Sequence, residues 1–378
     1  MKKMFSVFTA LLALFTLGSV PASAEGAASV SAAAAVIMNA DTGEVIFQKN
    51  AAQKLSMAST TKIMTALILA EQPDLSKTVQ VTRRMVTVEG SSMGLLEGDT
   101  VSYHDLLYGM LLASGNDAAN TTAYALAGSV EAFVRMMNRK AKALGMKNTS
   151  FVTPSGLDDE NHYSTAYDMA ILAAAALTND CFRAACSSST ATLYYGNPPY
   201  RRTLKNHNRL LDSYEGMIGV KTGFTKKSGR CLVTAAERDG VRVIAVTLND
   251  PNDWDDHRRM LDYGFEACCS VSFDNADIAD TVPVICGDCD LVRLQTEPVR
   301  FGVTKAAASK ITRRVELPRF IYSTVAAGEK VGSVGFYLEN RLICSADILS
   351  AADVKRCNRK DKLSKRFWNC LRQLMDSI

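Results

Sequence analysis

Three short motifs in this sequence carry the residue types of a serine nucleophile whose proton partner is a lysine. They are Ser59-Thr60-Thr61-Lys62, then Ser114-Gly115-Asn116, then Lys221-Thr222-Gly223, and each pattern (Ser-x-x-Lys, Ser-x-Asn, Lys-Thr-Gly) occurs once. A serine hydroxyl is a poor nucleophile until a neighbouring group takes its proton. A lysine can take that proton when burial or a nearby cation lowers the pKa of its amine. The set therefore predicts acyl transfer through a covalent serine intermediate.

The first motif supplies the nucleophile and the base. Ser59 and Lys62 are three residues apart in a segment that predicts a helix from Ser59 to about Glu71, so both side chains lie on one face. Lys221 is a candidate for the second cation that lowers the pKa of Lys62. Ser59 near the helix start also places its own backbone N–H beside the attacked carbonyl, where it suits an oxyanion hole.

The second motif falls at a predicted junction between a loop and a helix. The Ser114 hydroxyl could relay a proton to the leaving amine, and the Asn116 amide could hold Lys62 or the substrate backbone. Ser and Asn are also good helix N-caps, so a purely structural role is the alternative.

The third motif follows the apolar start of a predicted strand. On an edge strand, Lys221 and Thr222 could bind a substrate carboxylate, and Gly223 would let the substrate backbone approach closely. The backbone N–H of Phe224 could complete the oxyanion hole. The alternative is a solvated lysine beside a turn.

Other nucleophilic and metal chemistry finds little support in the sequence. The four histidines do not form a metal signature, and no Gly-x-Ser-x-Gly elbow accompanies a Ser-His-Asp triad. No metal site is expected.

Hydrophobic periodicity predicts one mixed α/β domain around the motifs. A hairpin is expected at its start, in the segments 33–38 and 44–47, and three strands near its end, in 217–223, 230–236 and 241–248. Between them, helical spacing recurs in 104–112, 118–127, 130–144 and 167–177, and a last helix is expected in 253–267. The sheet is therefore built from both ends of the domain.

Short β-branched or alternating segments follow Cys269 and predict a small all-β domain. They lie at 282–285, 291–296, 311–316, 330–338 and 341–345. We assign residues 25–270 to the catalytic domain, 275–350 to a small β-sandwich domain and 355–378 to a separate tail.

The two ends of the chain predict export and a membrane surface. Residues 1–24 read as a signal peptide, with two lysines, an apolar run and the cleavage site Ala22-Ser23-Ala24. Net charge is +4, but residues 355–378 alone contain eight Lys or Arg and two Asp. Wound as a helix, that tail gathers its apolar residues, including Phe367 and Trp368, in one arc of roughly 120° beside a cationic face. A helix packed on the β domain is the alternative.

These residues resemble the serine D-alanyl-D-alanine carboxypeptidases, the low-molecular-mass penicillin-binding proteins. The likeness covers about residues 29–268 strongly and extends beyond the three motifs. It includes the segments Met57 to Thr65, Ser92-Met93-Gly94-Leu95, Ser155-Gly156-Leu157-Asp158, Ser164 to Ala170, Asn208-Arg209-Leu210-Leu211 and Gly219 to Gly223. The fold implied is the serine β-lactamase/transpeptidase-like catalytic domain, followed by a small all-β domain and an amphipathic C-terminal helix.

The resemblance implies roles for individual residues. Ser59 is acylated, Lys62 accepts its proton, and Ser114 and Asn116 assist. Substrate binding falls to Lys221, Thr222, Gly223, Phe224 and Arg209. The implied substrate is a peptidoglycan stem peptide ending in D-Ala-D-Ala, with β-lactams as covalent inhibitors and no metal or organic cofactor. We expect an exported enzyme, peripheral on the outer face of the bacterial cytoplasmic membrane, that binds no nucleic acid.

Three alternatives stay open at this point. A β-lactamase of the same superfamily is one, but no Glu-x-x-Leu-Asn segment lies between the second and third motifs. A D,D-endopeptidase would use the same motifs on cross-linked substrates. A non-catalytic wall-binding or β-lactam-sensing protein is the third, and the intact Ser59 and Lys62 argue against it.

Overall fold

The computed structural model describes residues 29–275, 277–322 and 324–357. Within them the chain divides into two compact units, one ending at Cys269 and the other beginning at Ser270. The predicted signal peptide lies outside the described residues, as does the predicted tail helix after Cys357.

A five-stranded antiparallel sheet forms the centre of the first unit. Its strand order is β2-β1-β9-β8-β7, so β7, which carries the third motif, is an edge strand. The strands are β1 (Ala34–Asn39), β2 (Val45–Lys49), β7 (Met217–Thr225), β8 (Gly229–Arg238) and β9 (Val241–Leu248). In β1 and β9, Val36 pairs with Val246, so strands from the two ends of the unit meet at the middle of the sheet. The expectation of a sheet built from both ends is confirmed.

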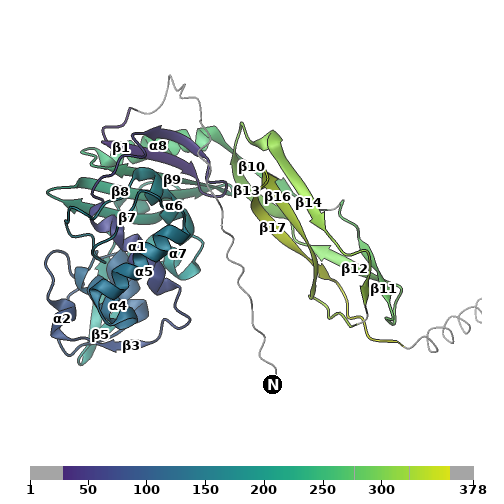
Figure 1. The fold of residues 1–378 in the computed structure, drawn as a ribbon, viewed down its shortest axis with the longest axis horizontal. Helices are drawn as coiled ribbons and strands as arrows, with labels where there is room; N and C mark the ends of the chain where they lie inside the picture. The colour runs from purple at the N-terminus through teal and green to yellow at the C-terminus, as the bar shows by residue number, and fades with distance from the viewer. Residues whose placement is uncertain (1–28, 276, 323, 358–378) are drawn as a thin grey trace, which may run out of the picture. The chain divides into compact units, whose positions relative to one another are not determined.

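The two faces of this sheet bury separate sets of side chains because successive residues of a strand point to opposite sides. Val36 and Met38 of β1 belong to the core shared with the helices of the middle of the chain. Ala35 and Ile37 belong to a second core that includes Met260 and Leu261 of α8 (Asp253–Ala267). Figure 1 accordingly shows α8 on one side of the sheet and the remaining long helices on the other.

The middle of the chain supplies those helices. They are α1 (Lys62–Ala70), α2 (Arg83–Val86), α3 (Tyr103–Leu111), α4 (Asn116–Ala127), α5 (Val130–Ala143), α6 (Ala166–Ala176) and α7 (Asp180–Ser187). Several begin at side chains that cap a free N–H, as with Ser129 before α5 and Thr165 before α6. Within the described residues no single helix is long and apolar enough to cross a membrane; α6 and α7 pass that test only jointly, as a pair bent by 110°.

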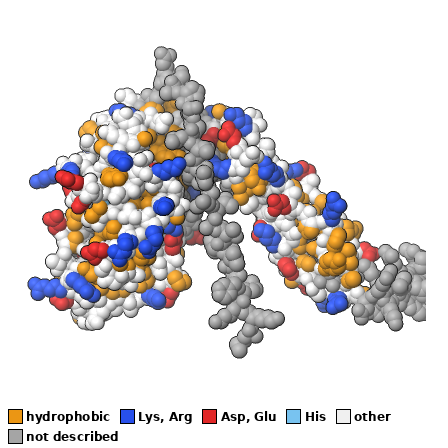
Figure 2. All heavy atoms as spheres, in the orientation of Figure 1, with side chains coloured by type: hydrophobic (Ala, Val, Ile, Leu, Met, Phe, Trp, Pro, Cys, Tyr) orange, Lys and Arg blue, Asp and Glu red, His pale blue; other side chains and the backbone are white. Residues whose placement is uncertain are grey.

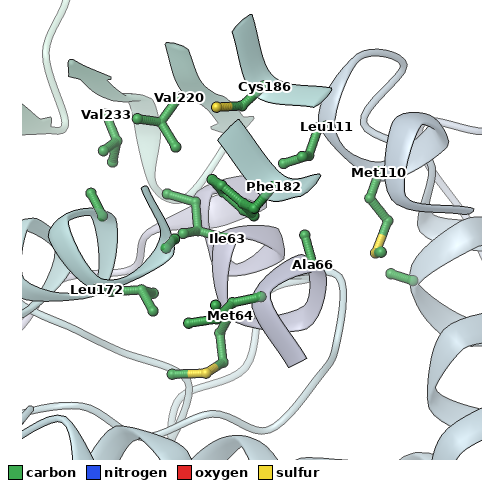
Figure 3. Packing of buried hydrophobic residues seen from close by; sticks show 14 of the residues in the cluster. Ile63, Met64, Ala66, Met110, Leu111, Leu172, Phe182, Cys186, Val220 and Val233 are labelled. Atoms are coloured by element: carbon green, nitrogen blue, oxygen red, sulfur yellow. The ribbon is translucent and has the colours of Figure 1, made fainter. Parts of the chain in front are cut away.

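Helix α1 lies at the centre of the core, and all nine of its residues are buried. Figure 3 shows Ile63 and Met64 surrounded by side chains from other elements, among them Leu172 of α6, Phe182 of α7 and Val233 of β8. Interiors of this kind are packed as tightly as organic crystals. The residues at the start of α1 are therefore held by a rigid element.

Part of the first unit was not predicted. A four-stranded sheet runs in the order β3-β4-β5-β6, and α7 follows the last predicted helix of the block. Its strands are β3 (Thr78–Gln80), β4 (Thr100–Ser102), β5 (Thr190–Gly196) and β6 (Pro199–Lys205). β3 and β4 are only three residues long, and β6 is mostly exposed. None of these three strands shows a clear periodic pattern.

The second unit is built from strands, as expected. One sheet has six strands in the order β14-β16-β17-β12-β11-β15, and a second pairs β10 with β13. The strands are β10 (Cys268–Phe273), β11 (Thr281–Ile285), β12 (Leu291–Thr296), β13 (Val299–Thr304), β14 (Ile311–Glu316), β15 (Ile321–Tyr322), β16 (Lys330–Leu338) and β17 (Arg341–Ser350).

Candidate active site

The nucleophile segment begins with a tighter turn than predicted. Ser59 lies in a 3-10 turn, η1 (Ala58–Thr61), which continues directly into α1 at Lys62, so the predicted helical segment is confirmed from Ala58 to Ala70. In a 3-10 turn, residues three apart lie directly above one another. Lys62 Nζ accordingly lies 2.9 Å from Ser59 Oγ.

Three oxygen atoms surround the amine of Lys62. Besides Ser59 Oγ, they are Asn116 Oδ1 at 2.7 Å and the backbone carbonyl of Ser155 at 2.8 Å. The amide and carbonyl oxygens can only accept hydrogen bonds, so they take the two N–H bonds of a neutral amine. The lone pair of that amine is then directed at the Ser59 hydroxyl. The arrangement orients Lys62 as a proton acceptor for Ser59.

The surroundings of Lys62 also favour its neutral form. Its side chain is fully buried, and this burial lowers the pKa of the amine well below its usual value. The positive charge of Lys221 lowers the pKa further, whereas the carboxylate of Asp117 raises it. Burial is the largest of these causes, so the position of α1 inside the core is what prepares this lysine as a base.

Asn116 serves the site and does not cap a helix. The N-cap of α4 is Gly115, and no side chain makes a capping hydrogen bond there, so the capping alternative is wrong. While Asn116 Oδ1 accepts from Lys62, its Nδ2 donates to the carbonyl of Glu89 at 2.6 Å. These two bonds fix the orientation of the amide. Ser114 is buried beside it, with φ at +57°.

Asp117 is a positioning residue that the sequence analysis missed. Its carboxylate accepts hydrogen bonds from Ser92 Oγ at 2.6 Å and from the backbone N–H groups of Met93, Gly94 and Leu95, each at 3.0 Å. This ties the loop before the second motif to the start of α4. The position of Asp117, directly after the Ser-x-Asn motif, was the only signal in the sequence.

Lys221 is buried in the edge strand β7, so the alternative of a solvated lysine is wrong. Burial lowers the pKa of its amine to about 7. Its Nζ donates to the carbonyl of Thr222 at 2.9 Å. A positive charge on Lys221 at neutral pH could bind a substrate anion. The same charge lowers the pKa of the Lys62 amine.

Gly223 lets β7 pack directly on the nucleophile turn. A Cβ atom at this position would lie 3.0 Å from the backbone nitrogens of both Ser59 and Thr60, and 3.1 Å from the Cβ of Ala58. Contacts this short are rare for a real Cβ, so a larger residue would require the strand or the turn to shift by a few tenths of an ångström. The close approach of the first and third motifs therefore favours glycine at this position.

A cavity of about 210 Å³ opens at Ser59. Its walls combine predicted residues with others from the neighbouring loops: Ser59, Glu89, Gly90, Ser91, Asn116, Ser155, Gly156, Leu157, Phe224 and Thr225. Ser59 and Phe224, whose backbone N–H groups are the predicted oxyanion hole, both line it. Within the described residues, no three His, Cys, Asp or Glu side chains gather where they could hold a metal ion.

Arg209 lies in the wall of a different cavity. It belongs to η2 (Arg209–Asp212), and its guanidinium lies 5.8 Å from the ring centre of Trp254. That second cavity, of about 260 Å³, is also lined by Arg230 and Asp253. A role for Arg209 in substrate binding stays a prediction.

His162 is a second positioning residue that the sequence did not reveal. Its Nδ1 accepts from the backbone N–H of Val152 at 2.9 Å, so the ring proton is on Nε2, which donates to Thr61 Oγ1 at 2.8 Å. The ring joins the nucleophile turn to the loop that ends in Ser155, whose carbonyl holds Lys62. Burial lowers its pKa to about 4, which keeps it neutral at physiological pH.

Comparison of the sequence with known protein families identifies the family of this chain. A profile described as D-alanyl-D-alanine carboxypeptidase matches residues 21–252. The chain belongs to that family. A profile for the C-terminal domain of penicillin-binding protein 5 matches residues 272–356.

Relatives and solved structures of the family agree with this. The chain is 32% identical over 336 residues to D-alanyl-D-alanine carboxypeptidase DacF of Bacillus subtilis, covering 86% of each protein. It is 37% identical over 279 residues to the D-alanyl-D-alanine carboxypeptidase of Streptomyces sp. strain K15, covering 68% of this chain and 94% of that protein. Penicillin-binding protein 5 of Haemophilus influenzae superposes with a TM-score of 0.62 at 28% identity, covering 86% of this chain and 98% of that one.

The family membership confirms the expected fold and enzyme class. The chain is a serine-type D-alanyl-D-alanine carboxypeptidase with a penicillin-binding catalytic domain and a C-terminal β domain of the kind found in this family. The crystal structure of the Streptomyces K15 DD-transpeptidase covers 63% of this chain with a TM-score of 0.61 at 34% identity.

Proposed function

We propose that this carboxypeptidase removes the terminal D-alanine from peptidoglycan stem pentapeptides with Ser59 as nucleophile and Lys62 as base. The observation that carries the proposal is the set of three contacts at Lys62 Nζ, with Ser59 Oγ, Asn116 Oδ1 and the Ser155 carbonyl. Because two of these oxygens only accept, a neutral Lys62 offers its lone pair to Ser59. The low pKa of Lys62 supports this protonation state.

Acylation follows from that arrangement. Ser59 Oγ attacks the carbonyl of the penultimate D-alanine while its proton moves to Lys62. The oxyanion is stabilised by the backbone N–H groups of Ser59 and Phe224. The proton then passes through the Ser114 hydroxyl to the nitrogen of the leaving D-alanine, and the C–N bond breaks. Water later hydrolyses the ester and returns the proton to Ser59.

Lys221 has a double role in this proposal. Together with Thr222 it binds the terminal carboxylate of the substrate, and a bound anion favours its charged form. A charged Lys221 in turn lowers the pKa of Lys62. Substrate binding would therefore help to keep the base neutral at the moment when it is needed.

We further propose that the enzyme is exported and works on the outer face of the cytoplasmic membrane, attached through its C-terminal tail. The signal peptide and the basic amphipathic pattern of residues 355–378 support this. Deleting the tail should release the mature protein from membranes with its activity on soluble peptides unchanged. A truncated protein that stays in the membrane fraction would contradict the tail as anchor.

The activity itself is tested by incubating the mature protein with a pentapeptide muropeptide and with a cross-linked dimer. We expect one D-alanine released per pentapeptide, and none from Ser59→Ala. Cleavage of the dimer without release of free D-alanine would instead identify an endopeptidase.

A further inference from the structure

The second unit carries an apolar surface that its own core does not use. We name it the edge patch and define it by five side chains. Pro283 and Ile285 belong to β11, Leu291 to β12 and Tyr322 to β15, and Phe320 directly precedes β15. All five are exposed, with exposed fractions of 56% at Leu291, 42% at Phe320 and 67% at Tyr322. In the orientation of Figure 2, apolar side chains gather on the β11–β12 end of this unit.

Strand register makes the edge patch continuous. Leu291 of β12 pairs with Pro283 of β11, and Ile285 of β11 pairs with Tyr322 of β15. Pro283 and Ile285 are two residues apart, so all four side chains lie on one face of the sheet. The rings of Phe320 and Tyr322 meet edge to face, with centres 5.4 Å apart.

The opposite face of the same strands is already packed. Val282 and Val284 of β11 are buried with Val292 of β12, and with Val325 and Val354. The alternation along β11 is therefore complete: one face forms the core and the other presents apolar side chains to solvent. A contiguous exposed apolar surface of this kind is a candidate site of interaction.

The chain leaves the second unit directly beside the edge patch. Gly287, two residues after Ile285, forms a bridge with Arg356, and Cys357 N–H donates to the carbonyl of Cys286 at 2.9 Å. Residues 358–378 follow, whose sequence has the basic amphipathic pattern of a membrane-surface helix. A tail of that kind brings this end of the unit to the bilayer.

Three exposed arginines lie near the edge patch, where Asp288 and Asp290 are also exposed. Arg293 lies two residues from Leu291 on the same face, Arg319 precedes Phe320, and Arg356 lies opposite Gly287. None of the three arginines makes an ion pair with another described residue. Aromatic side chains next to free cations suit the interfacial layer of a bilayer with anionic headgroups.

We propose that the edge patch is a second membrane contact, which lies in the headgroup layer next to the tail and holds the β domain against the bilayer. This rests on the membrane attachment proposed above. The edge patch binds the lipid surface, and its apolar contacts add to the membrane attachment made by the tail.

Binding to vesicles of phosphatidylglycerol and phosphatidylethanolamine tests the proposal with the full mature chain. The variant Phe320→Ser/Tyr322→Ser should bind these vesicles about tenfold more weakly, because two rings no longer enter the interface. The matched control Leu96→Ser/Val315→Ser removes two exposed apolar side chains outside the edge patch and should bind like the parent. Release of D-alanine from a soluble peptide should be unchanged in both.

A second readout reports contact directly. Tyr322→Trp should show more quenching by brominated lipids than the parent chain, whose own tryptophans give the baseline. If the parent binds vesicles but the edge-patch variant binds equally well and Tyr322→Trp gains no quenching, the second contact is refuted and the tail anchor stands. If the parent does not bind at all, the membrane attachment itself fails. Tighter binding by the edge-patch variant would mean that the edge patch holds the tail in the free protein, which also overturns the proposal.

Discussion

Replacing Asn116 by aspartate or alanine separates two contributions to the reactivity of Lys62. Asn116 Oδ1 lies 2.7 Å from Lys62 Nζ, and its Nδ2 is held by the carbonyl of Glu89. Asn116→Asp keeps the shape of the side chain but places a negative charge beside the amine. Asn116→Ala removes the acceptor and adds no charge.

Asn116→Asp should raise the pKa of Lys62, because an adjacent opposite charge favours the ammonium. Each pH unit of that rise lowers the neutral fraction about tenfold below the new pKa. The acid limb of the pH–rate profile for acylation should therefore move to higher pH. Asn116→Ala should instead slow acylation at every pH, since the lone pair of Lys62 is no longer oriented. Loss of one buried hydrogen bond costs about 1–3 kcal/mol, or roughly 5- to 150-fold in rate.

The assay is the second-order rate of acylation by a fluorescent penicillin as a function of pH. Asn120→Asp provides the control, because it makes the same change one turn later in α4 and outside the cavity at Ser59. An Asn116→Asp enzyme with the acid limb of the parent would refute Lys62 as the base. A shift of equal size in Asn120→Asp would show that the effect is general electrostatics.

Further predictions concern the supports of the site. Gly156 has φ at +88°, and an added Cβ would lie 1.9 Å from a backbone carbonyl oxygen. Gly128 is the control, because it has φ at +76° but open space around the added Cβ. Gly156→Ala should therefore lower the unfolding free energy by more than Gly128→Ala. The left-handed backbone alone costs about 1–2 kcal/mol, and equal losses in urea unfolding would argue against the clash. His162→Ala should slow acylation about tenfold, and His162→Gln, which keeps a donor and an acceptor, should restore most of the rate; equal rates in both would remove the positioning role. The buried His162 and His257 have pKa values lowered to about 4 and about 3, so only the unfolded chain takes up protons as the pH falls below the usual histidine value. Stability should therefore be complete above about pH 6.5 and fall by up to about 1.4 kcal/mol per pH unit for each histidine as the pH drops towards those values. His257→Gln should flatten that dependence, and an unchanged slope would exclude His257 as a source.

The sequence predicted those parts of the fold whose periodicity is strong. The segments around β1, β7, β8 and β9 are apolar and bounded by turns, and α5 and α8 show clear helical spacing. The strands β3 to β6 were missed because they are short or exposed, and the sheet also depends on the pairing of β4 with β5, which are distant in the sequence. Local pattern carries no information about such contacts.

The candidate site was predictable in its chemistry and less so in its geometry. Ser59, Lys62 and Asn116 were named from motif spacing, and the structure brings their side chains within hydrogen-bonding distance. The Ser155 carbonyl could not be found in this way, because a backbone carbonyl has no sequence signature. The ring of His162 could not be found either, because the sequence does not distinguish a histidine that supports the site from any other buried histidine. The sequence likewise gave no reason to separate Arg209 from the cavity at Ser59.

The most direct test of this account is mass spectrometry of the mature protein after a short exposure to benzylpenicillin, followed by peptide mapping. We expect one penicilloyl group per chain, attached to Ser59, and no adduct in Ser59→Ala. Lys62→Met, which removes the base but leaves the serine, should be labelled far more slowly at the same residue. An adduct on any other serine, or full labelling of Ser59→Ala, would contradict Ser59 as the nucleophile.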